Sequence, residues 1–386
     1  MRRLTIRRTV LPPGRGERRW RARGLAGAAA LVLLGGCDSL LDVTDPSSVN
    51  EEDLNTVEAL PVIRAGVISD FQTALGGSSS VNGLVLLSGL LGDELIDAQQ
   101  DPLRQLIDQR SLSTDNLSFA VAQLYRQLQR ARVAAEAASA KYASFDSTTS
   151  VNRAEMLALA GYAYVLLGET FCSGVPFSKL ERTPVYGTPQ TTTQIFTTAV
   201  AKFDSALAIT SAGAQGNLAS VGKGRALLDL HDPAGAGAAV AGVSPAFTYS
   251  IEFSGNSQAQ WNATFFFIFN GLASVANVEG GVGLPYVLDG DARTPTLVTG
   301  TVGLDNSTPL TQQLKYGSLD ADIVLASGTE ASLISAEAVL RGGDAATWLA
   351  TLNALRASAG LADTTDPGTD AGRLALTFRE RSYWLW

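Results

Sequence analysis

The stretch AEMLALAGYAYVLLGE, residues 154–169, is apolar on nearly every side. A helix that is hydrophobic all round is normally buried among other helices. Small side chains within it let neighbouring backbones approach closely: Ala154, Ala158, Ala160, Gly161 and Ala163. We therefore predict a mainly α protein assembled around a buried helix over about 150–170.

Amphipathic segments flank this buried helix on both sides. Residues 114–142 carry one apolar face, and residues 191–207 begin with Thr191-x-x-Gln194, a plausible capping box. Further helices are expected over about 218–230 and 234–242, and again from residue 330 onward. Short Ala-rich helices joined by tight turns predict tetratricopeptide-like helical hairpins over about 114–242 and 330–386. An irregular all-helical domain is the alternative.

Residues 243–329 differ in character from the helical segments. Gly, Asn, Ser, Thr and aromatic residues dominate the first part, and no helical period is convincing there. We predict a loop-rich insert with possible short strands, in which the run Phe265–Phe269 is buried. Residues 76–113 and the Gly- and Pro-containing residues 173–190 are also expected to be irregular.

The N-terminal residues have the pattern of an export signal. Nine arginines precede an apolar run that ends in Leu34-Gly35-Gly36-Cys37. This matches a bacterial lipobox, so residues 1–36 are predicted to be a lipoprotein signal peptide and Cys37 the lipidated residue. Residues 37–49 then form a short tether. An ordinary signal peptide that happens to contain a cysteine is the alternative. A single-pass anchor is disfavoured, because ten apolar residues cannot cross a hydrocarbon core of roughly 30 Å.

The charge of the chain excludes some partners. Of 29 basic and 37 acidic residues, nine arginines and one acid precede Cys37, which leaves 20 basic and 36 acidic residues and a net charge of −16. Such a balance argues against nucleic acid as a partner and against electrostatic binding to anionic lipid. It fits a soluble body that is held to a membrane by its acyl group.

Catalytic and metal chemistry has little support in the sequence. The single histidine, His231, precedes Asp232-Pro233 at an expected helix end, and we interpret Cys172 as a packing residue. Gly222-Lys223-Gly224 lacks the spacing of a phosphate-binding loop. Asp93-Glu94 is a carboxylate pair of the kind that glycoside hydrolases use, but adjacent acids on a loop are usually solvated. We predict no catalytic residue, no metal and no cofactor.

Aromatic side chains of the insert are the better candidates for ligand binding. Sugars present apolar C–H faces that stack on aromatic rings, while polar groups read their hydroxyls. Trp261 and Tyr286 are the candidate stacking residues, with Asn262 and Asp291 as polar companions. The alternative is that these residues belong to the core of the insert. Trp348 lies at core spacing on a helix and is interpreted as structural.

Several segments of the chain, taken in order, resemble one known protein family. Each segment is weakly specific, and their order along the chain carries the resemblance. The matching segments are CDSLLDV (37–43), RAEMLALAGYAYVLLGETFCSGVPF (153–177), 191–207, EASLISAEA (330–338), LNALRA (352–357) and FRER (378–381). In this order they resemble the SusD/RagB family of nutrient-binding outer-membrane lipoproteins.

The resemblance implies a fold and a role for residues 50–386. It implies a SusD-like α-helical domain, anchored in the outer membrane and facing the cell exterior, without enzymatic activity. Such proteins capture an oligosaccharide, a peptide or another nutrient beside a TonB-dependent, SusC-like transporter. The family pattern usually continues beyond Trp386, so we expect a truncated product. If Tyr383, Trp384, Leu385 and Trp386 are exposed, we expect aggregation.

Two other functions stay open from the sequence. One is a periplasmic tetratricopeptide lipoprotein that serves as a scaffold for other proteins. The other, with less support, is a glycoside hydrolase that uses Asp93 and Glu94.

Overall fold

The computed structural model describes residues 52–112, 119–180, 183–278 and 283–386. The predicted signal peptide (1–36), the predicted lipidation site Cys37 and the predicted tether (37–49) lie outside the described residues. The residues from Leu54 to Trp386 form one compact unit. Among the described helices, none combines the length and the apolar character that a membrane crossing requires.

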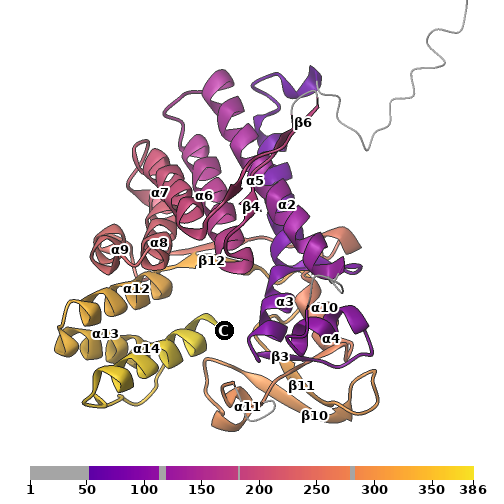
Figure 1. Ribbon diagram of the computed structural model, residues 1–386, viewed down its shortest axis with the longest axis vertical. Coiled ribbons are helices and arrows are strands. Elements are labelled where there is room, and N and C mark those ends of the chain that lie inside the picture. Colours follow the sequence, from indigo (N-terminus) through magenta and orange to yellow (C-terminus); the bar gives the residue numbers. More distant parts are fainter. Residues whose placement is uncertain (1–51, 113–118, 181–182, 279–282) are drawn as a thin grey trace, which may run out of the picture. The chain divides into compact units, whose positions relative to one another are not determined.

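Helical hairpins form the first part of this unit, as the sequence predicts (Figure 1). Each helix packs against the next along the chain, and α2 packs against α5. The helices are α2 (Leu60–Leu75), α5 (Phe119–Phe145), α6 (Val151–Phe171), α7 (Thr192–Leu207), α8 (Gly213–Asp229) and α9 (Pro233–Val240).

Glycines in α6 and α8 explain how closely these helices pack. A Cβ on Gly161 would lie 2.7 Å from a ring carbon of Phe203, and one on Gly222 would lie 2.4 Å from the same ring. Phe203, on α7, is fully buried and packs edge-on against Tyr162 with 5.3 Å between the ring centroids. The absence of a side chain at Gly161 therefore leaves room for the Phe203 ring of α7 to pack against α6.

A second set of helices continues the stack. Helix α12 (Gly328–Arg341) packs against α8 and α9, and also against α13 (Ala345–Ser358) and α14 (Asp370–Leu385). Trp348 of α13 is fully buried, and its indole N–H donates to the hydroxyl of Thr377 on α14 at 2.9 Å. The structural role predicted for Trp348 is confirmed.

Several helices begin with a side-chain cap. The predicted capping box is present: the Thr191 hydroxyl accepts from the Gln194 backbone N–H, and the Gln194 side chain accepts from the Thr191 N–H. Four other helices have a single N-cap hydrogen bond, in which the capping side chain accepts from a backbone N–H: Asp232 caps α9, Ser327 caps α12, Asp344 caps α13 and Thr369 caps α14.

The insert contains the predicted short strands. They form antiparallel pairs, in which β3 joins the insert to an earlier part of the chain. The pairs are β8 (Thr248–Ile251) with β12 (Ile323–Ser327), β3 (Leu95–Asp97) with β9 (Ala273–Val275), and β10 (Thr296–Val302) with β11 (Pro309–Gln313). Three short helices accompany them: η2 (Gln258–Gln260), α10 (Ala263–Phe269) and α11 (Tyr286–Asp289).

Helix α10 corrects the prediction for the phenylalanine run. Residues 265–269 are helical because the Asn262 side chain caps the backbone N–H groups of Thr264 and Phe265. A helix turns its side chains to different sides, so Phe267 is buried while Phe269 is 59% exposed. The prediction that the whole run is buried is therefore wrong for Phe269.

Shorter elements occupy the other segments that were expected to be irregular. Residues 76–113 hold β1 (Gly77–Ser78), β2 (Val81–Asn82), α3 (Leu84–Leu91) and α4 (Pro102–Asp108), preceded by η1 (Glu52–Leu54). The loop over 173–190 holds β4 (Val175–Pro176), β5 (Lys179–Leu180), β6 (Pro184–Val185) and β7 (Pro189–Gln190).

The last residues of the chain are not an exposed apolar cluster. Tyr383 is buried, and Trp384 and Trp386 pack partly against apolar neighbours, while Leu385 is 40% exposed. The condition under which aggregation is expected is therefore not met.

Candidate functional site

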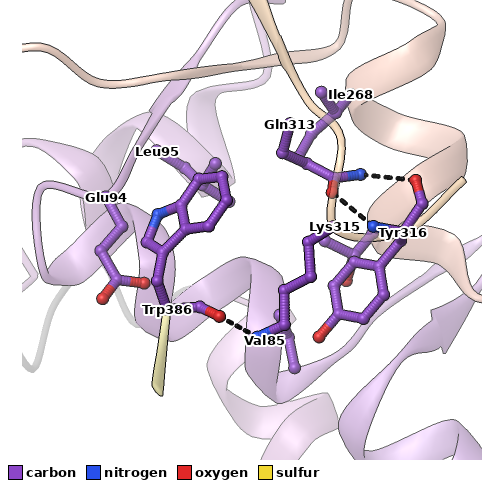
Figure 2. Close-up of a pocket in the computed structure, with 9 residues that line it drawn as sticks. Val85, Glu94, Leu95, Ile268, Gln313, Lys315, Tyr316 and Trp386 are labelled. Atoms are coloured by element: carbon purple, nitrogen blue, oxygen red, sulfur yellow. Dashed lines mark hydrogen bonds between the residues drawn. The ribbon is translucent and has the colours of Figure 1, made fainter. Parts of the chain in front are cut away.

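A small pocket lies where the insert meets α3, β3 and the last residue of the chain. It is lined by residues from both halves of the sequence: Val85, Glu94, Leu95, Thr264, Ile268, Gln313, Lys315, Tyr316 and Trp386. Figure 2 shows the Trp386 indole beside Glu94 and Leu95, with Gln313, Lys315 and Tyr316 across from it. A mostly apolar pocket with a few convergent polar groups is the usual form of a small-molecule site.

Glu94 and Lys315 supply opposite charges to this pocket. Burial raises the pKa of Glu94, while the Lys315 charge and the Tyr286 hydroxyl lower it. Burial also lowers the pKa of Lys315, and the Glu94 charge opposes that effect. The Lys315 ammonium donates to the backbone carbonyl oxygen of Trp386.

Local hydrogen bonds fix both of these charged residues. The Glu94 backbone N–H donates to the Gly89 carbonyl at 2.9 Å, and the Glu94 carbonyl accepts from Ala276 at 2.9 Å, which continues the β3–β9 pairing. After β11, the Gln313 side chain accepts from the Tyr316 N–H at 2.7 Å and donates to the Tyr316 carbonyl at 3.1 Å. This turn sets the direction of Lys315, which lies between the two residues.

Aromatic rings form a wall behind the pocket. The ring of Tyr286 lies 6.0 Å from that of Trp386 and 5.2 Å from that of Tyr383, measured between centroids. Tyr286 itself is buried, and burial raises its pKa. The wall gives the pocket an apolar ring face beside charged groups.

The four binding residues predicted from the sequence divide into two pairs. Trp261 and Asn262 immediately precede α10, whereas Tyr286 and Asp291 lie close to α14. Trp261 is half-buried, its ring packs on Phe266, and its indole N–H donates to the Gly255 carbonyl at 3.2 Å.

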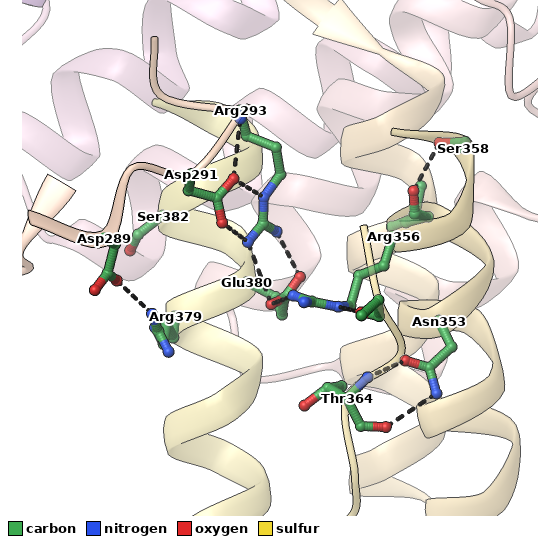
Figure 3. A network of polar contacts seen from close by, with 12 residues as sticks. Asp289, Asp291, Arg293, Asn353, Arg356, Ser358, Thr364, Arg379, Glu380 and Ser382 are labelled. Atoms are coloured by element: carbon green, nitrogen blue, oxygen red, sulfur yellow. Dashed lines mark hydrogen bonds and ion pairs between the residues drawn. The ribbon is translucent and has the colours of Figure 1, made fainter. Parts of the chain in front are cut away.

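Asn262 and Asp291 have structural partners that the sequence did not reveal. The Asn262 amide is fully buried; it caps α10 and donates to the Ala321 carbonyl at 2.8 Å. Asp291 forms an ion pair with Arg293 at 2.7 Å, and Arg293 in turn contacts Glu380 (Figure 3). The polar groups of Asn262 and Asp291 are therefore both engaged within the protein.

The acidic pair Asp93-Glu94 is also placed differently from the prediction. Neither residue is a solvated loop side chain: Asp93 is buried and paired with Arg110 at 2.5 Å, and Glu94 lines the pocket. Asp93 adopts a positive φ of 57°, so the two neighbouring carboxylates turn to different partners. Lys315, Tyr316 and Trp386 had no sequence signal, because each is isolated from Glu94 along the chain.

Two other reactive residues lie away from the pocket. His231 is exposed at the end of α8, as predicted. Cys172 is exposed with φ of 56°, so the interpretation of this cysteine as a packing residue is wrong. Within residues 52–112, 119–180, 183–278 and 283–386 there is no group of three or more His, Cys, Asp and Glu that could hold a metal ion.

Solved structures provide the comparison with known proteins, since no family model matches the chain and no curated protein matches it in sequence. A SusD-like carbohydrate-binding protein from Bacteroides vulgatus superposes with a TM-score of 0.62 at 14% identity, over 86% of this chain and 81% of that one. The surface glycan-binding protein A from Bacteroides thetaiotaomicron, solved with laminarihexaose, gives a TM-score of 0.62 at 12% identity, over 85% and 89%.

A SusD/RagB family protein from Bacteroides thetaiotaomicron gives a TM-score of 0.56 at 15% identity, over 83% of this chain and 79% of that one. Identities this low establish the fold rather than the activity. This chain has the SusD-like fold.

Proposed function

We propose that this chain is a surface lipoprotein that captures an oligosaccharide or a peptide-like ligand and delivers it to a TonB-dependent outer-membrane transporter. The likeness in fold to a glycan-binding protein solved with laminarihexaose is the observation that carries this proposal. The order of SusD-like segments in the sequence supports it independently. The acidic composition fits a body that is held to its membrane by lipid rather than by charge.

The pocket beside Trp386 is the proposed capture site. Trp386 offers a ring face for the C–H face of a sugar, and Glu94 and Lys315 can accept from and donate to its hydroxyls. Tyr286 supports both Trp386 and Glu94 from behind. The half-buried ring of Trp261 stays a candidate for an additional stacking contact.

Titration calorimetry with laminarihexaose and a panel of other oligosaccharides and peptides tests capture. We expect saturable binding of at least one compound, weakened about tenfold or more by Lys315→Met and by Glu94→Gln, because each removes a charge-assisted hydrogen bond. Lys223→Met is the matched control, since Lys223 is paired with Asp204 on the hairpin surface. No binding across the panel would refute capture, and unchanged binding by both variants would refute this site.

The anchor and the location are tested in intact cells. We expect acyl label on the wild-type protein and none on Cys37→Ala, and we expect added protease to degrade the protein without lysis. A TonB-dependent barrel should co-purify with it. Shielding from protease would favour the periplasmic scaffold instead.

The proposal treats the protein as a binder rather than an enzyme. Prolonged incubation with the captured oligosaccharide should leave it uncleaved. Cleavage that disappears in Glu94→Gln would favour the glycoside hydrolase alternative.

A further inference from the structure

Arg104, on α4, is a buried cation that does not itself line the pocket beside Trp386. Its side chain is 2% exposed, and its Nε atom donates at 2.8 Å to Oδ1 of Asp97, whose side chain is 1% exposed. Taking two charges out of water costs about as much as their attraction returns, so a buried ion pair adds little stability over an apolar pair of similar volume. Stability alone therefore does not account for a guanidinium at this position.

Hydrogen bonds fasten α4 to β3, so that Arg104 keeps a fixed place beside the strand. The Asp97 backbone N–H donates to the side chain of Asp108, at the end of α4, at 3.2 Å. At the start of α4, the Asp101 side chain accepts from the Leu103 N–H at 2.9 Å. The ion pair between Arg104 and Asp97 is a further link between the helix and the strand.

On its other side, Arg104 contacts α10. The guanidinium carbon lies 5.0 Å from the centre of the Phe267 ring, which is the geometry of a cation–π contact. Hydrogen bonds hold both ends of α10: the Asn262 N–H donates to the Leu319 carbonyl at 2.8 Å, and the Leu272 N–H donates to the Phe267 carbonyl at 2.8 Å. These end contacts leave the rotation of the helix about its own axis to side-chain contacts along its length.

Both partners of Arg104 are next to residues that line the pocket. Asp97 follows Leu95 by two residues in β3, and alternate residues of a strand point to the same face. Phe267 immediately precedes Ile268 in α10. Leu95 and Ile268 both line the pocket. Arg104 therefore connects the β3 wall of the pocket to its α10 wall.

We propose that Arg104 is a positioning residue of this pocket: its guanidinium, held by Asp97, sets the rotation of α10 through Phe267 and so places Ile268 relative to Leu95. The role of the pocket in capture is the proposed function on which this inference rests. The placement of the two walls, however, can be observed without a ligand. A site whose walls are fixed by buried contacts loses less order when a ligand binds.

Methyl NMR of the ligand-free, full-length protein tests the placement of the walls. Arg104→Met removes the cation, and Arg104→Met combined with Asp97→Asn also removes the carboxylate charge that the single variant leaves buried without a partner. We expect the Ile268 methyl resonances to shift in both variants, and to shift less in Arg104→Lys, which keeps a cation for both partners. An Ile268 signal that stays unchanged in both methionine variants would overturn the proposal.

Arg132→Met is the matched control. Arg132 is equally buried, forms an ion pair with Glu136 at 2.7 Å and lies over the rings of Tyr164 and Phe177, but it belongs to the hairpin helix α5 and does not line the pocket. We expect Arg132→Met to leave the Ile268 resonances in place. Equal shifts in the Arg104 and Arg132 variants would show a general loss of packing and would overturn a specific role for Arg104.

Calorimetry with laminarihexaose and the wider panel measures the consequence for capture. For a compound that the wild type binds, we expect affinity to fall about tenfold in the double variant, to recover in large part in Arg104→Lys, and to stay unchanged in Arg132→Met. Equal losses in the double variant and in Arg132→Met would refute positioning. If the wild type binds no compound of the panel, capture fails, and the NMR comparison decides the role of Arg104 by itself.

Discussion

Arg293 and Glu380 form a buried ion pair, with 2.6 Å between a guanidinium nitrogen and a carboxylate oxygen across 87 residues of sequence. Their side chains are only 5% and 2% exposed. Arg356 of α13 binds the other oxygen of Glu380 at 2.7 Å, and Asp291 binds Arg293 (Figure 3). One carboxylate on α14 therefore joins the insert and two C-terminal helices.

Glu380→Ala should destabilise the protein by roughly 3–5 kcal/mol, because it leaves two guanidinium groups without their shared carboxylate in a buried setting. Urea unfolding monitored by tryptophan fluorescence measures this difference. Asp370→Asn on the same helix is the control: its side chain is fully exposed, so a change within about 0.5 kcal/mol is expected. Equal behaviour of the two variants would show that the network contributes little to stability.

Alanine substitution at two glycines should change the stability of the protein in opposite directions. Gly222→Ala would bring a Cβ within 2.4 Å of the Phe203 ring, and we expect a loss of about 1–3 kcal/mol. Gly66→Ala, in the exposed face of α2, meets no atom within 4 Å and should gain up to about 1 kcal/mol through helix propensity. Thermal unfolding of the two variants measures both. A neutral Gly222→Ala would contradict the close approach of α7 and α8.

Deprotonation of Asp97 should lower the free energy of unfolding as the pH rises. Burial raises the pKa of Asp97 from 3.8 to about 6, although Arg104 opposes this with a hydrogen bond of 2.8 Å. The folded protein therefore holds this proton more tightly than the unfolded chain does. The resulting stabilisation is present below about pH 4 and is lost by about pH 6. Unfolding free energies of the wild type should fall relative to Asp97→Asn across that window.

Asp305 serves as a control, because its titration should change the stability with pH in the opposite direction. Desolvation raises the pKa of Asp305, but the hydrogen bonds from Thr308 and Ser307 together outweigh it and lower the pKa to about 2. Its stabilisation is present above about pH 4 and is lost as pH falls towards 2. Asp305→Asn should therefore lose stability relative to the wild type above pH 4. A parallel response of the two variants would contradict these assignments.

Because the Cys172 thiol is exposed, the number of thiols that react with maleimide tests whether Cys37 is lipidated. If Cys37 is acylated, maleimide should label one thiol per native protein, because Cys172 is exposed and Cys37 is blocked. Cys172→Ser should then show no labelling. Two labelled thiols in protein purified from membranes would contradict acylation.

The sequence alone determined the helical part of the fold. Residues 154–169 are apolar all round, so they had to be enclosed by other helices, and the amphipathic segments at 114–142 and 191–207 provide the enclosing faces. The capping box at Thr191 fixed a helix start, because its hydrogen bonds form between neighbours in the chain. The spacing of apolar residues and the capping residues are local properties of the chain. Both can be recognised in the sequence without knowing which segments contact each other in the fold.

Only the tertiary structure decided the candidate sites. Glu94 and Lys315 are more than 200 residues apart, and no local pattern marks either as part of a pocket. Asn262 and Asp291 looked available in the sequence, but one caps a helix and the other binds Arg293. Whether a polar group is free depends on which distant groups come within about 3 Å, and only the packing of the whole chain sets those distances.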